Sequence, residues 1–90
     1  MIKRTDGVTS ETVDDQAVLI APSGEEIITL NEVGTVIWGA LEQPSDVDAL
    51  AAQVLAAFPD APVGEVRQDV VDFVAELREA GLVEGDVAPS

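Results

Sequence analysis

The stretch ITLNEVGTVIW, Ile28–Trp38, predicts a β-strand that becomes a helix with almost no loop between the two. Up to Leu30 the side chains alternate, so that Ile28 and Leu30 share one face. From Val33 onward the apolar residues recur every three or four positions, which is typical of an amphipathic helix. Asn31, at the junction, is a good N-cap because its side-chain oxygen can accept a hydrogen bond from the first turn. We therefore expect a helix that folds directly back onto the strand before it, with Gly34 allowing a close approach of a neighbouring segment.

Two further strands are predicted before this junction. Residues 8–15, VTSETVDD, and residues 16–22, QAVLIAP, are short runs of β-branched and apolar residues separated by turn residues. Pro22 and Gly24 predict a tight turn ahead of the third strand, EIITL, at residues 26–30. Three short strands with brief connections indicate an antiparallel meander, and the residues up to about Gly7 are expected to be loose.

Two more helices are predicted after the junction. Ser45 is the expected N-cap of the second helix, and Pro59 marks its end. The third helix is expected from about Val63 to Ala80, with Val63 on its apolar face and Gly81 as a left-handed C-cap. Strands first and helices second predict an α+β fold, winged helix-turn-helix-like, with a three-stranded antiparallel sheet followed by three helices. We expect a single domain over residues 1–90, an ordered core at about 8–84 and a mobile tail after Glu84.

Composition excludes several classes of function. The net charge is −14, with 18 acidic residues against four basic ones, and there is no cysteine or histidine. Such a chain repels phosphate, so nucleic acid and anionic membranes are not expected as partners. Disulfides, zinc fingers and the usual catalytic triads are excluded, and no spacing suggests a nucleophile or a metal cage. We therefore expect no enzymatic activity, no metal and no cofactor.

Two further features have simple interpretations. The first residues, MIKRTDGVTS, are followed by no apolar run, so neither a secretory signal nor a membrane helix is predicted, and the cytoplasm is the expected location. Trp38, the only tryptophan, is expected to be a core residue.

The third strand is the candidate binding element. In a meander of three strands the first and third have free edges, which invite pairing with another chain. The third helix could form the other wall of a groove beside this strand, and an extended peptide could bind there as a fourth strand. Asp69, Asp72 and Glu76 would then favour a peptide that carries Lys or Arg. The residues alone leave open whether this edge binds a peptide or is merely protected by Glu25 and Glu26.

The segments LNEVGTVIW, DVDALAAQVLAAF and VRQDVVDFVAELREAGLV, in this order and spacing, resemble the PqqD-like family of peptide-recognition elements. The resemblance extends from about Val18 to Glu84. It implies that the chain binds the leader segment of a ribosomally synthesised precursor peptide, by β-strand addition to the third strand beside the third helix. Carried onto this sequence, the strand contacts are Glu26, Ile27, Ile28, Thr29 and Leu30, and the helix contacts are Val66, Asp69, Val70, Phe73, Glu76 and Leu77.

Within that family the chain is most similar to the discrete B1 proteins of lasso-peptide pathways. It has ALEQPSD after the first predicted helix, where a Cys-Asp-Gly stretch is associated with PqqD itself. This resemblance implies that a separate leader peptidase or modifying enzyme receives the precursor. Three alternatives stay open: a PqqD-type chaperone for a radical SAM enzyme, an acyl-carrier-like protein modified on Ser45, and a module that self-associates through the same edge.

Overall fold

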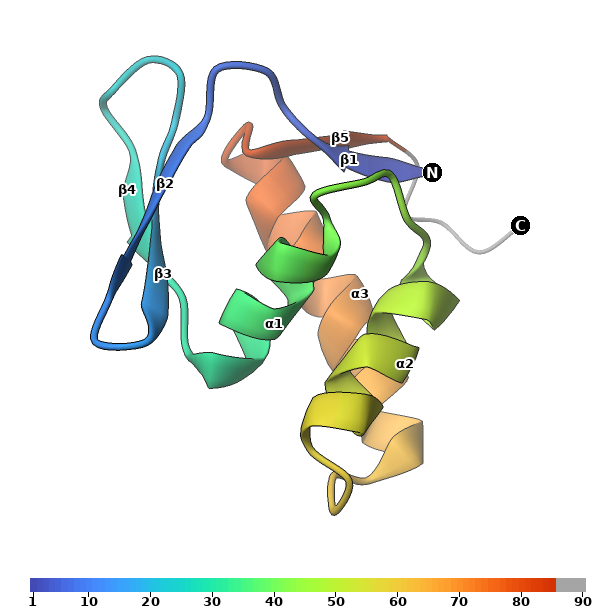
Figure 1. Cartoon of the computed structure of the whole chain (residues 1–90). Coiled ribbons are helices and arrows are strands. Elements are labelled where there is room, and N and C mark those ends of the chain that lie inside the picture. Colours follow the sequence, from blue (N-terminus) through green and yellow to red (C-terminus); the bar gives the residue numbers. More distant parts are fainter. Residues whose placement is uncertain (86–90) are drawn as a thin grey trace.

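A computed structural model describes residues 1–85, which form three helices and two antiparallel sheets (Figure 1). The predicted α+β architecture is confirmed, including the meander followed by three helices. The elements, in chain order, are β1 (Ile2–Arg4), β2 (Thr9–Val13), β3 (Gln16–Ile20), β4 (Ile27–Thr29), α1 (Glu32–Ala40), α2 (Val47–Ala57), α3 (Val63–Glu79) and β5 (Val83–Gly85). The predicted tail after Glu84 lies mostly outside the described residues.

The three-stranded sheet has the order β2-β3-β4, so β3 is its central strand. Asp14 and Asp15 connect β2 to β3 and both have positive φ, 52° and 65°, as in the type I′ turns that suit two-residue hairpins. The predicted turn before β4 is confirmed, because the amide of Gly24 donates to the carbonyl of Ala21 at 2.8 Å. In Figure 1 all three helices lie on the same side of this sheet.

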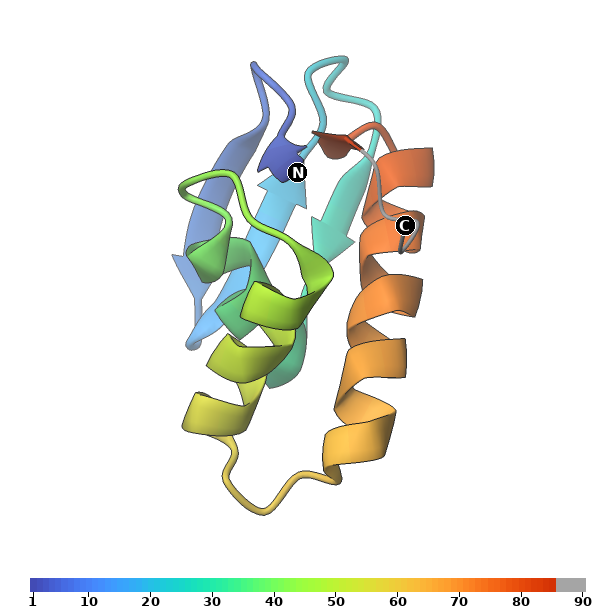
Figure 2. The ribbon, with the colours of Figure 1, turned by 90° about the vertical axis from the view of Figure 1, so that its right-hand side faces the viewer.

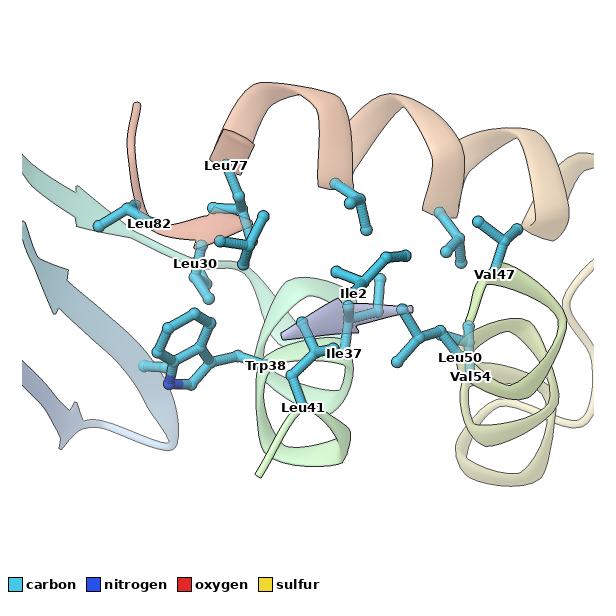
Figure 3. Packing of buried hydrophobic residues seen from close by; sticks show 14 of the residues in the cluster. Ile2, Leu30, Ile37, Trp38, Leu41, Val47, Leu50, Val54, Leu77 and Leu82 are labelled. Carbon is cyan, nitrogen blue, oxygen red and sulfur yellow. The ribbon is translucent and has the colours of Figure 1, made fainter. Parts of the chain in front are cut away.

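The prediction that the amino-terminal residues are loose is wrong. They form β1, which pairs with β5 from the other end of the described chain. Ile2 is only 1% exposed, and Figure 3 shows its side chain among those of the helices. Its backbone also pairs with Ser45 on the other side. On the exposed face Lys3 and Glu84 form an ion pair at 3.0 Å, which raises the pKa of Lys3. Residues 2–4 therefore form an ordered strand, with Ile2 in the core.

The helix ends follow the predicted chemistry with one exception. Asn31 caps α1, and its side-chain oxygen accepts from the amide of Gly34 at 2.8 Å. Gly81 has φ of 77° after α3, and the amide of Leu82 donates to Leu77, as in a Schellman motif. The prediction that Ser45 caps α2 is wrong, because the cap is Asp46, which accepts from Ala49. Ser45 instead uses its backbone to pair with Ile2.

The core joins side chains from the helices, the central strand and the small sheet (Figure 3). Trp38 is buried as predicted, and the guanidinium of Arg4 lies 4.3 Å from the centre of its ring. The prediction that Val63 belongs to the apolar face of α3 is wrong: 69% of its surface is exposed, because it lies in the first turn, beyond the core. Among the described helices, none has the length and apolar content needed to cross a membrane.

Candidate functional site

The free edge of β4 presents backbone groups that no described residue uses. The amide of Leu30 donates to Ala17, and Glu26 accepts from Ala21, so these pairs carry the hydrogen bonds to β3. Hydrogen-bonded pairs alternate in an antiparallel ladder, and the Ile28–Leu19 pair is the next one in this register. It follows that the N–H and C=O groups of Ile27 and Thr29 point away from β3, toward open space.

The side chains of β4 project alternately to the two faces of the sheet. Ile28 lies opposite the fully buried Leu19 and is half-buried itself, on the face covered by the helices. Ile27 and Thr29 lie on the other face and are exposed. A strand that adds to this edge would therefore bond to Ile27 and Thr29 and would place alternate side chains beside Ile28.

Helix α3 contributes an acidic side to the same region. Asp69, Phe73 and Glu76 are spaced by four and three residues, so they share one face of the helix. Arg67 and Arg78, eleven residues apart, share the opposite face, and Arg67 forms an ion pair with Asp48 of α2. Arg67 is thus turned toward α2, and carboxylates remain on the side of Phe73.

Gly34 leaves room for Phe73, the aromatic residue on this acidic side of α3. A Cβ at Gly34 would lie 3.0 Å from one carbon of the Phe73 ring and 3.2 Å from the Cβ of Leu30. Phe73 therefore packs against the first turn of α1 at the point where β4 ends, and only a glycine leaves it this space. In Figure 2, β4 is the strand of the three-stranded sheet that lies nearest to α3. We call the backbone edge of Ile27 and Thr29, together with Asp69, Phe73 and Glu76, the edge site.

Thr35 fixes the start of α1 to the sheet. Its hydroxyl donates to the carbonyl of Asn31 at 2.8 Å and accepts from the amide of Ala17 at 3.0 Å. Ala17 is the residue of β3 that also receives the amide of Leu30. The strand-to-helix junction is therefore held on both sides, and the end of β4 is rigidly positioned beside Phe73.

The structure divides the predicted contact residues into two groups. Val66, Val70 and Leu77 are buried in the core beneath α3, with at most 4% of their surface exposed. Leu30 is likewise buried. Exposed or half-exposed surface remains at the other predicted positions: Glu26, Ile27, Ile28, Thr29, Asp69, Phe73 and Glu76. The buried residues pack in the core and hold α3 and the end of β4 in place, whereas the residues of the second group have surface that a ligand could contact.

An apolar pocket of about 280 Å³ lies where the start of α1, the end of α2 and the start of α3 meet. It was not predicted, because its residues come from three elements and no sequence pattern connects them. Asp69 is its acidic residue and also belongs to the edge site. The pocket is lined by Val33, Val54, Phe58, Ala61, Pro62, Val66 and Asp69.

A family model described as coenzyme PQQ synthesis protein D (PqqD) matches residues 16–83, which include the whole edge site. The chain belongs to the PqqD family. A relative, the PqqA binding protein of Rhizobium meliloti (strain 1021), is 35% identical over 74 residues, which cover 82% of this chain and 72% of the relative.

Solved structures agree with this assignment. TbiB1 in complex with the TbiA(beta) leader peptide matches with a TM-score of 0.84 and 28% identity, covering 96% of this chain and 99% of TbiB1. A lasso peptide synthetase B1 complexed with the leader peptide matches with a TM-score of 0.78 over 93% of this chain and 98% of its own. Its identity is 19%, so this second likeness supports the fold alone.

Proposed function

We propose that this protein binds the leader segment of a ribosomally synthesised precursor peptide as a fourth strand next to β4. The observation that carries the proposal is the outward-facing backbone of Ile27 and Thr29. It occurs in a PqqD-family chain whose fold matches a leader-peptide complex over 96% of its length. Backbone bonds to the edge provide affinity, and side-chain contacts provide selectivity, as in other cases of β-strand addition.

The chemistry of the edge site favours a particular kind of leader. Alternate leader side chains would lie beside Ile28 and Phe73, which are apolar and half-exposed, so apolar residues suit those positions. Asp69 and Glu76 have no ion pair with any described basic residue. Their negative charge would therefore favour binding of a leader that also carries Lys or Arg. The pocket beside Asp69 would take an apolar side chain of the leader just outside the paired segment.

The protein would act as an adaptor without catalytic chemistry. By holding a precursor close to a separate leader peptidase or modifying enzyme, it raises the local concentration of the substrate. The likeness to TbiB1, which is solved with a leader peptide, supports leader binding, and we propose that this occurs in a lasso-peptide type of pathway in the cytoplasm. The 35% identity to a PqqA binding protein keeps a chaperone for a radical SAM enzyme as the second candidate. An acyl-carrier role has no support, since Ser45 is half-buried and its backbone pairs with Ile2.

Two threonine-to-proline variants test the strand addition. Thr29→Pro removes an outward-facing N–H from β4. Thr12→Pro removes the equivalent group from β2, at the opposite edge of the sheet, where Glu11 and Val13 carry the bonds to β3. Proline is tolerated at such edge positions, so both variants should fold.

We expect Thr29→Pro to weaken binding of a synthetic leader peptide by about 5- to 30-fold, because one bond is lost and one leader carbonyl stays unpaired. Thr12→Pro should bind like the unaltered protein in the same calorimetric titration. Equal affinities for two folded variants would contradict strand addition at β4.

The charge of the preferred leader is tested with two double variants of equal net charge. Asp69→Asn with Glu76→Gln removes two negative charges from the edge site. Gln43→Lys with Gln53→Lys changes the total charge by the same amount at exposed positions of the α1–α2 connection and of α2. The first variant should bind a basic leader about 2- to 10-fold more weakly, because exposed ion pairs contribute up to about 1 kcal/mol each. A similar loss in both would show that only the overall charge matters.

A further inference from the structure

The face of the three-stranded sheet that points away from the helices is apolar in its centre. Cross-strand partners share a face, so the register places Ile20 beside Ile27 and Val18 beside Thr29 on this outer side. Val13 lies opposite Gln16 on the same side. No described element packs against this face, as Figure 1 shows. We call Val13, Val18, Ile20 and Ile27 the outer sheet face.

These residues are exposed to an unusual degree for large apolar side chains. Ile27 is 66% exposed and Val13 is 54% exposed, and Val18 and Ile20 are half-exposed between them. Single exposed apolar residues are ordinary on a protein surface, but a group that spans all three strands of a sheet is typical of an interaction surface.

Carboxylates border the outer sheet face on three sides. Glu11 lies on β2, Asp14 and Asp15 form the β2–β3 turn, and Glu25 lies in the connection before β4. None of them has an ion-pair partner among the described residues. Charge complementarity therefore favours a partner protein whose apolar contact surface is bordered by Lys or Arg.

The fourth side of the outer sheet face is the free edge of β4. A leader strand bonded to Ile27 and Thr29 would have its hydrogen-bonded residues directly opposite these two. Their side chains would lie on the same face as Ile27 and Thr29, since paired residues project to the same side of a sheet. Bound leader would thus extend the outer sheet face by one strand, without covering it.

We propose that the outer sheet face, completed by the outward side chains of the bound leader, is the docking surface for the leader-processing enzyme. The enzyme would contribute an apolar patch bordered by basic residues and would bind the loaded protein more tightly than the empty one. This inference rests on the proposed function, because it needs the leader at β4. The inward side chains of the added strand would contact this protein, and its outward side chains would contact the enzyme.

The test uses the purified protein, its synthetic leader peptide and the purified leader-processing enzyme from the same gene neighbourhood. Affinity of the enzyme is measured by surface plasmon resonance for the empty protein, the loaded protein and the leader alone. The test variant is Ile20→Lys, with Val13→Lys as a second variant if the first fails to fold. Val63→Lys is the matched control, because Val63 is 69% exposed but lies on α3, away from the sheet.

We expect loading to tighten enzyme binding by about tenfold or more, and Ile20→Lys to remove that gain, because the lysine would bury its charge against the partner's apolar patch. Affinity for the leader itself should be unchanged in Ile20→Lys, and Val63→Lys should behave like the unaltered protein. An enzyme affinity that is equal for empty and loaded protein, or equal for Ile20→Lys and Val63→Lys, would overturn the inference. So would an Ile20-dependent dimer of the loaded protein in sedimentation velocity, since a second copy would then occupy the face. Failure of the leader to bind at all is a separate result, against the proposed function.

Discussion

Replacing Gly34 by alanine tests the close contact between the first turn of α1 and Phe73 of α3. A Cβ there would lie 3.0 and 3.1 Å from two carbons of the Phe73 ring, whereas carbon atoms at rest are about 3.5–4.0 Å apart. Overpacking of this kind costs about 1–3 kcal/mol. Alanine also gains about 1 kcal/mol over glycine inside a helix. The net effect of Gly34→Ala should therefore be a destabilisation of about 0–2 kcal/mol.

Gly39 is the matched control in the same helix. A Cβ at Gly39 meets nothing within 4 Å, so Gly39→Ala should stabilise the protein by about 0.5–1 kcal/mol. Urea unfolding measures both effects. With a slope of about 1 kcal/mol per molar urea, the two midpoints should differ by roughly 0.5–3 M. In a Phe73→Ala background the ring is gone and the Cβ of Leu30, at 3.2 Å, is the remaining close neighbour, so Gly34→Ala should lose most of its penalty but stabilise less than Gly39→Ala. Equal stabilisation by both alanines in the presence of Phe73 would refute the close contact.

Two further predictions concern the ends of the described chain. Ile2→Ala should destabilise the protein by about 2–5 kcal/mol, because Ile2 is fully buried, whereas Lys3→Ala should change its stability by less than about 0.5 kcal/mol. Thermal unfolding followed by circular dichroism measures both effects. Equal small effects would mean that β1 does not contribute to the core. Gly81→Ala should cost about 1–2 kcal/mol, since its φ of 77° is unfavourable for any residue with a Cβ. Gly64→Ala should instead be stabilising in the same urea titration, because Gly64 lies in α3 with open space around it, and equal effects at the two glycines would contradict the left-handed cap.

The parts of the fold that follow from local chemistry were predictable. Asn31 as a cap, Gly81 as a left-handed stop and the apolar stripes of the helices depend on residues within one or two turns of one another. β1 was not predictable in this way. Ile2–Arg4 is too short to show a periodicity, and its partner β5 lies at the other end of the described chain. The same pairing explains the misplaced cap of α2: Ser45 and Asp46 are both good caps, and the bridge from Ser45 to Ile2 decides between them.

The candidate site was predictable in outline but not in orientation. Alternation along residues 26–30 indicated that Ile27 and Thr29 share a face. Which backbone groups point outward depends on the register between β3 and β4, which the sequence of one strand does not contain. Likewise, the spacing on α3 grouped Val66, Val70 and Leu77 with Phe73, and only packing against the sheet distinguishes buried residues from those with free surface. The pocket beside Asp69 is assembled from three elements and depends entirely on that packing.

Hydrogen exchange of the backbone amides, followed by NMR with and without leader peptide, tests strand addition most directly. In the free protein the amides of Ile27 and Thr29 should exchange rapidly, as should those of Ser10 and Thr12 on the opposite edge. Saturating leader should slow exchange at Ile27 and Thr29 and leave Ser10 and Thr12 unchanged. Bound leader without added protection at Ile27 and Thr29 would contradict pairing at β4 and would mean that the peptide is held elsewhere.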